Sequence, residues 1–188
     1  MARMYQTQEM RYPRTAAWIR QMRTTIPGRD NGRIFAAFRE YAQLTEEQAL
    51  AAFTWGQDPL IRFVRLAGGP GRPRGSTAGL FVPRSPTAVL VSYAYADAYE
   101  ENPRLHRNEI ALEFIVLHEM VHWGDWRHDQ VMRPDQLDRR GRSLDAGDQF
   151  ERAAYGTHST ELYLHLRQQE QERGRYSNTY DPMMDLDL

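Results

Sequence analysis

The sequence of 188 residues contains no cysteine. A disulfide framework and thiolate metal ligands are therefore excluded, and any metal site must be built from histidine and carboxylate side chains. Lysine is also absent: all 24 basic residues are arginine, which we attribute to a GC-rich coding sequence rather than to function. Without cysteine, the chain is suited to a reducing or an oxidising compartment.

Strong net charge and long apolar segments are missing too. The formal net charge is −1 at pH 7, which gives no electrostatic basis for binding nucleic acid or a membrane surface. No apolar stretch is long enough to cross a membrane, and the first residues lack the apolar core of a signal peptide. We therefore expect no nucleic-acid partner and no membrane insertion. We see no internal repeat and no linker, and we expect one domain over residues 1–188, with residues 1–12 and 175–188 flexible.

What the sequence does contain is the pattern His-Glu-x-x-His, at His118, Glu119 and His122, closing an apolar run over residues 110–117. Residues four apart lie on the same face of a helix, so the two imidazoles can bind one zinc ion. Glu119 starts one residue further round the helix, where it can hold the water that zinc activates and act as the general base. The pattern therefore predicts a zinc hydrolase, whereas two histidines on an ordinary helix are the simpler structural alternative.

Hydrophobic periodicity predicts a mixed α+β fold, mostly helical with a small sheet. Helices are expected over residues 13–22, 31–41 and 45–54, the last opened by a capping-box pattern, and strands over 60–66, 79–82 and 87–93. The motif helix is expected over residues 107–123, followed by a polar loop over 128–147 and one last helix over 148–173. This order suits a zincin-like plan, in which an edge strand lies above the helix that carries the motif. We take residues 88–93 as the candidate edge strand, to which a substrate peptide would add.

A catalytic zinc usually has three protein ligands and one open position. The first candidate for the third ligand is Glu151, in the first turn of the last helix, and the alternative is a carboxylate favoured there by the helix dipole. Tyr155, one turn further on, is the candidate donor to the oxyanion, with a core aromatic as the alternative. Asp148 is a candidate partner for a ligand histidine, and Asp148 or Glu161 is a further candidate for the ligand itself.

The second candidate for the third ligand is His128, since His118 to His128 has the spacing of metzincins. That family has glycine three residues after the second histidine, where the helix stops, but Asp125 stands there and Gly124 comes one residue early. The departure counts against His128. His158 and His165 lie seven apart on the expected last helix, and we assign them surface or core roles.

Two segments together resemble a known family. The run His118-Glu119-Met120-Val121-His122-Trp123-Gly124-Asp125, followed by Asp145-x-Gly147-x-x-Phe150-Glu151-x-x-x-Tyr155-Gly156, is similar to the zinc metallopeptidase toxin domains of bacterial effectors. These include C-terminal domains of type VI secretion spike proteins. The Tyr-Gly ending is also similar to the deuterolysin-like group, whose third ligand is an aspartate three residues before the tyrosine. Here Glu151 stands four before Tyr155, so that match is partial.

The resemblance implies that His118, His122 and Glu151 hold zinc and that Glu119 is the catalytic base. It further implies a secreted antibacterial or host-directed effector that hydrolyses peptide bonds in a target cell, in the periplasm by expectation. A specialised secretion system would deliver it without a signal peptide, with a spike carrier and a cognate immunity protein as partners. A zinc amidase that cuts peptidoglycan cross-links, a metzincin-like protease that uses His128 and a non-enzymatic domain with a relic zinc site are the alternatives.

Overall fold

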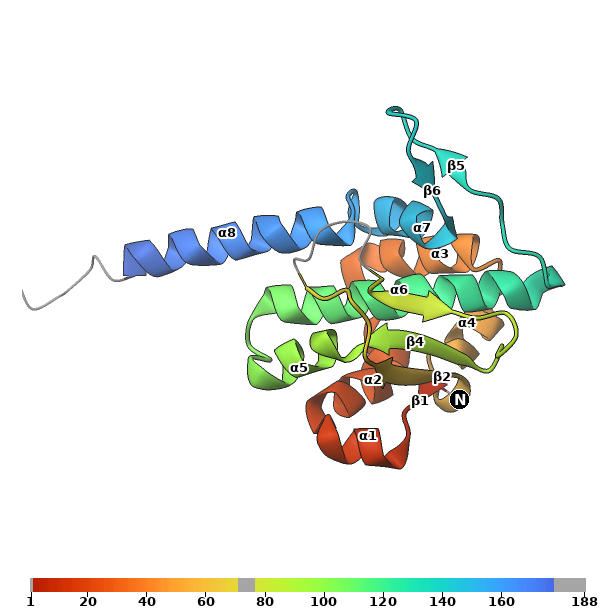
Figure 1. Ribbon diagram of the computed structural model, residues 1–188, viewed down its shortest axis with the longest axis horizontal. Helices are drawn as coiled ribbons and strands as arrows, with labels where there is room; N and C mark the ends of the chain where they lie inside the picture. The colour runs from red at the N-terminus through yellow and green to blue at the C-terminus, as the bar shows by residue number, and fades with distance from the viewer. Residues whose placement is uncertain (1, 71–76, 178–188) are drawn as a thin grey trace, which may run out of the picture.

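The computed structural model describes residues 2–70 and 77–177, which form a mixed α+β fold (Figure 1). The helices and strands follow in this order: β1 Ala2–Arg3, α1 Gln6–Arg11, α2 Pro13–Thr25, the 3-10 helix η1 Arg29–Gly32, α3 Arg33–Tyr41, α4 Glu46–Ala52, β2 Trp55–Val64, β3 Gly79–Phe81, β4 Ala88–Ser92, α5 Tyr93–Glu101, α6 His106–Asp129, β5 Gln136–Leu137, β6 Ser143–Leu144, α7 Ala146–Tyr155 and α8 Ser159–Ser177. The α+β class expected from the sequence is confirmed. No helix within the described ranges combines the length and apolar character needed to cross a membrane.

The main sheet has four strands in the order β1-β2-β4-β3. β1 and β4 pair with β2 in parallel, whereas β3 pairs with β4 antiparallel, with Gly79 opposite Val91 and Phe81 opposite Val89. The expectation that residues 88–93 form an edge strand is wrong, because β4 lies between β2 and β3. Its run of apolar residues is typical of a strand with a neighbour on each side. The edge on the side of the motif helix is β3.

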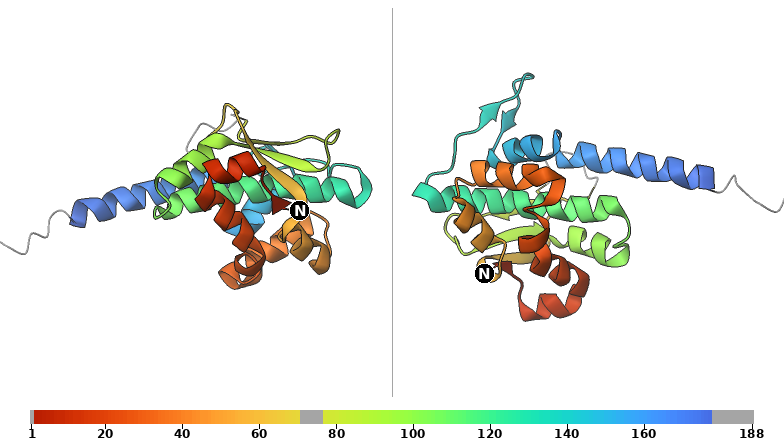
Figure 2. Two further views of the ribbon diagram at one scale, coloured as in Figure 1. Left: turned by 90° about the horizontal axis from the view of Figure 1, so that it is seen from below. Right: turned by 180° about the vertical axis from the view of Figure 1, so that it is seen from behind.

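Helix α6 is the centre of the molecule. It packs against β3 and β4 on one side and against α3 and α7 on another (Figures 1 and 2). Its middle turns are apolar nearly all round and buried, as expected for a helix with neighbours on every side. The helix is longer than predicted at its C-terminal end, where it runs on to Asp129. The site residues on α6 are therefore held by the core.

The N-terminal segment, expected to be flexible over residues 1–12, forms β1 and α1 in its described part. Met4 and Tyr12 are each 3% exposed and belong to the core. The Gln8 side chain binds the main chain of Phe63 in β2, accepting from its N–H at 3.1 Å and donating to its carbonyl. These contacts attach α1 to the sheet. Of the other segment expected to be flexible, residues 178–188 lie outside the described residues.

The last helix differs from its prediction, because two helices replace one. α7 ends at Gly156, which has a left-handed φ of 78° and donates its N–H to the Arg152 carbonyl at 2.9 Å. Glycine adopts this conformation at no steric cost, so it is the usual residue at such a helix end. α8 then begins at Ser159 and extends away from the body of the molecule (Figure 1). His158 and His165 therefore do not share a helix face, since His158 precedes α8.

Candidate metal centre

The two motif histidines lie one turn apart on α6 and face the same side of the helix. Their ring centroids are 5.0 Å apart. Their side chains are only 15% and 12% exposed, because the surrounding turns of α6 are buried. The buried, mostly apolar residues 110–117 thus hold the part of α6 from which both imidazoles project, as the sequence predicted.

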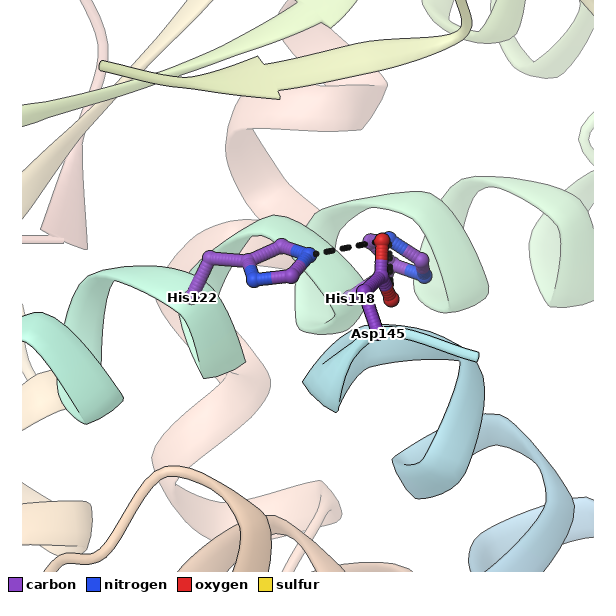
Figure 3. A group of neighbouring side chains, drawn as sticks. All are labelled: His118, His122 and Asp145. Carbon is purple, nitrogen blue, oxygen red and sulfur yellow. Dashed lines mark ion pairs between the residues drawn. The ribbon is translucent and has the colours of Figure 1, made fainter. Parts of the chain in front are cut away.

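Asp145, at the start of α7, faces both histidines (Figure 3). Its Oδ2 lies 3.4 Å from His122 Nε2, and its Oδ1 lies 3.7 Å from His118 Nε2. Asp145 is also the N-cap of α7, because its Oδ1 accepts the N–H of Asp148 at 2.8 Å. The three side chains form a group whose ligand atoms all lie within 4.8 Å of one another. Two imidazoles and one carboxylate are a donor set that suits zinc.

The two histidines stabilise the negative charge of Asp145. Burial alone would raise the pKa of Asp145, but the hydrogen bond from His122 and the charges of both histidines hold that pKa well below its usual range. The Asp145 carboxylate is therefore ionised at neutral pH. Its side chain is 41% exposed, so the group is open to solvent on one side.

Gly147 makes room for the His118 ring. A Cβ built at Gly147 would lie 2.4 Å from His118 Nε2 and 2.5 Å from two further ring atoms. Contacts shorter than 3.0 Å force one of the partners to move, so a side chain is excluded unless the ring or the helix end shifts. The glycine in the segment Asp145-x-Gly147 thus lets the first turn of α7 come against the imidazole.

Glu119 lies directly beneath the edge strand. It is 4% exposed, and a Cβ built at Gly79, the first residue of β3, would lie 2.3 Å from its Oε1. Burial raises the pKa of Glu119, while the charges of His118 and His122 lower it, and the net direction is upward. The Glu119 carboxylate is therefore next to Gly79 at the strand edge and near enough to both histidines to be affected by their charges.

Glu151, the residue expected to be the third ligand, contacts the other nitrogen of His118. Its Oε1 lies 3.0 Å from His118 Nδ1, whereas Asp145 faces Nε2. Glu151 also forms a second group of ligand type with His118 and Asp148. Burial lowers the pKa of His118, but the hydrogen bond and charge of Glu151 outweigh it and raise that pKa to about 10. The structure thus brings Glu151 to the site, on the Nδ1 side of His118.

Tyr155 contacts a different part of α6. Its hydroxyl donates to Glu113 Oε1 at 2.9 Å, and its ring stacks on Phe114 with centroids 3.8 Å apart. Phe114 lies one turn before His118. The oxyanion role of Tyr155 stays a prediction, and in this structure its hydroxyl proton is engaged by Glu113.

His128 lies outside the site that the described residues form. The structure contains two groups that could hold a metal within its described ranges, and neither includes His128. α6 does not stop after the motif, so His128 stays on the helix, about 120° round from His122 at 100° per residue, and is exposed. Asp125, at the position of the metzincin glycine, is fully buried and accepts from Gln43 and from the main chain of Arg133.

The remaining sequence candidates are placed as follows. Asp148 Oδ1 lies 3.4 Å from His158 Nδ1, and Glu161 is exposed and accepts from the Thr157 hydroxyl. Asp145 and Gly147 belong to the segment that carries the family resemblance, but no role was predicted for either, and Gly79 was predicted only as the start of a strand. Asp145 carried a usable signal, since an aspartate before Ala-Gly at the start of a helix is a typical N-cap. Nothing local in the sequence indicates that this cap faces the histidines.

Comparisons with known proteins agree with the geometry. The model of the family described as metallopeptidase toxin 3 matches residues 8–156, which include the whole group around His118 and exclude α8. No curated protein and no solved structure matches the chain.

Proposed function

The chain belongs to the metallopeptidase toxin 3 family, and we propose that it binds zinc with His118, His122 and Asp145 and uses Glu119 as the base. Membership makes the protein a hydrolase that cleaves peptide bonds and a toxin domain. The identity of the metal and the roles of single residues are our proposal. The observation that carries it is that Glu119 lies beside Gly79 of β3 and is near enough to both motif histidines to be affected by their charges.

The residues fit the metal. Two imidazole nitrogens, one ionised carboxylate and a side open to solvent are the arrangement of a catalytic zinc site, which keeps a position for substrate or water. Gly147 provides the space that brings Asp145 and His118 together. When bound, zinc lowers the pKa of water and polarises a carbonyl.

Asp145 is the better third ligand because it faces Nε2 of both histidines. Glu151 bonds Nδ1 of His118, and one ring nitrogen is all that a histidine offers to a given ion. A metal-binding histidine usually donates its other N–H to a carboxylate, which fixes the ring and raises its basicity. We assign that role to Glu151, which replaces the ligand role expected from the sequence.

The edge strand supplies the place for the substrate. In the described part of the chain β3 has one strand partner, β4. A peptide that adds to the other side of β3 is held by main-chain hydrogen bonds and lies beside Gly79, above Glu119. Gly79 keeps that approach free of a side chain. The carboxylate of Glu119 then accepts a proton from the attacking water and returns it to the leaving amine.

An extended protein segment suits this edge better than a peptidoglycan cross-link. L-residues favour the extended conformation that pairs with β3, whereas D-residues, as mirror images, disfavour the negative φ values of that conformation. We propose a protein substrate in a target cell, reached through a type VI secretion spike, with a cognate immunity protein in the producing cell. Digestion of target-cell proteins by the purified chain, compared with digestion of muropeptides, separates the two substrates.

The test is zinc content and peptidase activity across a set of variants, each checked for folding. We expect about one zinc per chain in the wild type, lost in His122→Ala and Asp145→Ala. Glu151→Ala should keep zinc with affinity about 10–100-fold weaker. Glu119→Gln should keep zinc and lose about 10²–10⁴-fold in kcat. His128→Ala is the matched control on the same helix and should change neither property.

Three outcomes would contradict the proposal, in part or as a whole. Zinc kept in Asp145→Ala but lost in Glu151→Ala would restore Glu151 as the third ligand. An active Glu119→Gln variant would remove Glu119 as the base. A wild type that binds no zinc after metal is added would overturn the proposal as a whole.

A further inference from the structure

The turn between α7 and α8 places a buried histidine beside the metal centre. Gly156 ends α7 with a left-handed φ of 78°, and the carbonyl of His158 accepts the Leu162 N–H at 3.1 Å to begin α8. The His158 ring lies against Asp148, Glu151 and Arg152 of α7, and the residue is only 6% exposed. Only the main chain of His158 is used in starting α8, so the contacts of its buried ring need a separate explanation.

Arg152 fixes the tautomer of this ring. Its Nε lies 3.1 Å from His158 Nε2, and a second guanidinium nitrogen lies 3.0 Å from the same atom. A guanidinium can only donate, so His158 Nε2 must accept and carries no proton. The remaining proton of the neutral ring is then on Nδ1.

His158 Nδ1 is within ion-pair distance of two carboxylates near His118. His158 Nδ1 lies 3.5 Å from Glu151 Oε2 and 3.4 Å from Asp148 Oδ1. The other oxygen of Glu151, Oε1, lies 3.0 Å from His118 Nδ1. The Glu151 carboxylate thus lies between the two histidines with one oxygen toward each, while Asp148 is a second acceptor at a similar distance from His158.

Arg152 is itself held from the far side. It donates to Asp138 Oδ2 at 3.0 Å, and the Asp138 side chain is 3% exposed at the turn between β5 and β6. Asp138 also accepts from the Arg142 side chain at 2.6 Å and from two main-chain N–H groups. The contacts therefore run in a series from Asp138 to Arg152, from Arg152 to His158, and from His158 to Glu151.

We propose that His158 is a positioning residue for the metal site. Held by Arg152, it donates from Nδ1 to Glu151, and Glu151 in turn holds the His118 ring with Nε2 toward Asp145. His158 touches neither metal nor substrate. The inference rests on the proposed zinc site. The role of His158 is to hold His118 Nε2 in the orientation that binds zinc, also when no metal is bound.

Two near-isosteric variants separate this role from simple packing. His158→Asn places an amide N–H near the position of Nδ1, so the bond to Glu151 can persist. His158→Gln reaches toward the Nε2 position and keeps a contact to Arg152, but it offers nothing to Glu151. His165→Gln is the control, because His165 is exposed on α8 and contacts only Gln169 among the described residues.

The measurement is the zinc dissociation constant by competition with a chromophoric chelator, together with the visible spectrum of the cobalt-substituted protein. We expect His158→Gln to weaken zinc about tenfold and to change the cobalt spectrum. His158→Asn and His165→Gln should stay within about threefold of the wild type, with the wild-type spectrum.

Equal zinc affinity in all three variants would show that His158 only fills space and would overturn the proposal. Equally weak binding in His158→Asn and His158→Gln would overturn it too, because donation from Nδ1 would not be the property that matters. Two zinc ions per wild-type chain, with one lost in His158→Asn, would make His158 a ligand. A wild type without zinc would instead refute the proposed function.

Discussion

At the scale of single residues, the site depends on side chains that make two contacts through two different polar atoms. Asp145 caps α7 with one oxygen and faces both motif histidines with its carboxylate. His118 faces Asp145 with one nitrogen and Glu151 with the other. Each of these side chains connects a helix to the proposed metal site. Small structural changes next to them should therefore alter the affinity for zinc.

Gly147→Ala tests the closest of these contacts. The new Cβ would lie 2.4 Å from His118 Nε2, so the ring or the first turn of α7 must move. We expect zinc affinity to fall by about tenfold or more, as measured by chelator competition. Gly28→Ala is the control, since nothing lies within 4 Å of its Cβ. Wild-type affinity in Gly147→Ala would mean that the ring moves freely without affecting the metal.

Tyr155→Phe separates two roles for this tyrosine. Removing the hydroxyl leaves the buried Glu113 oxygen without that donor, which should cost about 1–3 kcal/mol in the free energy of unfolding. We expect kcat to change only a few-fold. Urea unfolding and peptidase kinetics measure the two effects. A hundredfold loss of kcat at unchanged stability would instead support the oxyanion role predicted from the sequence.

Local periodicity explains why the motif residues were predictable and Asp145 was not. His118, Glu119 and His122 are related by helix geometry alone, so a spacing of four residues suffices to bring the imidazoles together. Asp145 follows a hairpin and reaches the histidines only because α7 packs on α6. Which nitrogen of His118 meets Glu151 depends on that same packing, and a sequence carries no local sign of it.

At the scale of elements, two expectations failed for identifiable reasons. The run over residues 148–173 suggested one helix, but Gly156 takes a left-handed conformation and ends α7. Strand β4 was expected at the edge, whereas the short β3 takes that place. Sequence periodicity indicates that a strand or helix exists, while strand order depends on contacts between distant segments.

Arg29 joins η1 to α6 and offers a pH-dependent test of this junction. It is 25% exposed and pairs with the fully buried Glu113 and with Glu109. Burial raises the pKa of Glu113, and the charge of Arg29 lowers it. In Arg29→Ala the pKa of Glu113 should rise further. At low pH Glu113 is then protonated and its burial costs little. As the pH rises, Glu113 ionises without its partner and the free energy of unfolding falls.

We therefore expect Arg29→Ala to cost about 2–3 kcal/mol in the free energy of unfolding at pH 8 and less at pH 5. Urea unfolding at both pH values, with zinc held constant, measures the difference. Arg33→Ala is the control, because Arg33 forms an exposed pair with Asp30 and should change stability by less than about 0.5 kcal/mol at either pH. A cost for Arg29→Ala that grows toward low pH would contradict the assignment.

At the scale of the whole molecule, the metal should stabilise the fold, since the proposed ligands come from α6 and from the start of α7. Zinc at 100 times its dissociation constant should add about 2.7 kcal/mol. For a chain of this size that corresponds to a Tm higher by roughly 5–10 °C. Thermal unfolding with zinc and with a chelator measures the shift. Asp145→Ala should show none, and an equal shift in that variant would place the metal elsewhere.

Among the described residues, β3 has a strand partner on one side only, and this affects how the protein behaves in solution. An edge that accepts a peptide also offers unpaired main-chain groups to another copy of the chain, which is how sheets start to aggregate. Both edge strands in the described sheet are short: β3 has three residues and β1 has two. Natural sheets limit self-association by short edges of this kind. The shortness of β3 should therefore limit self-association of the protein through this edge, even if the edge accepts a substrate segment as proposed.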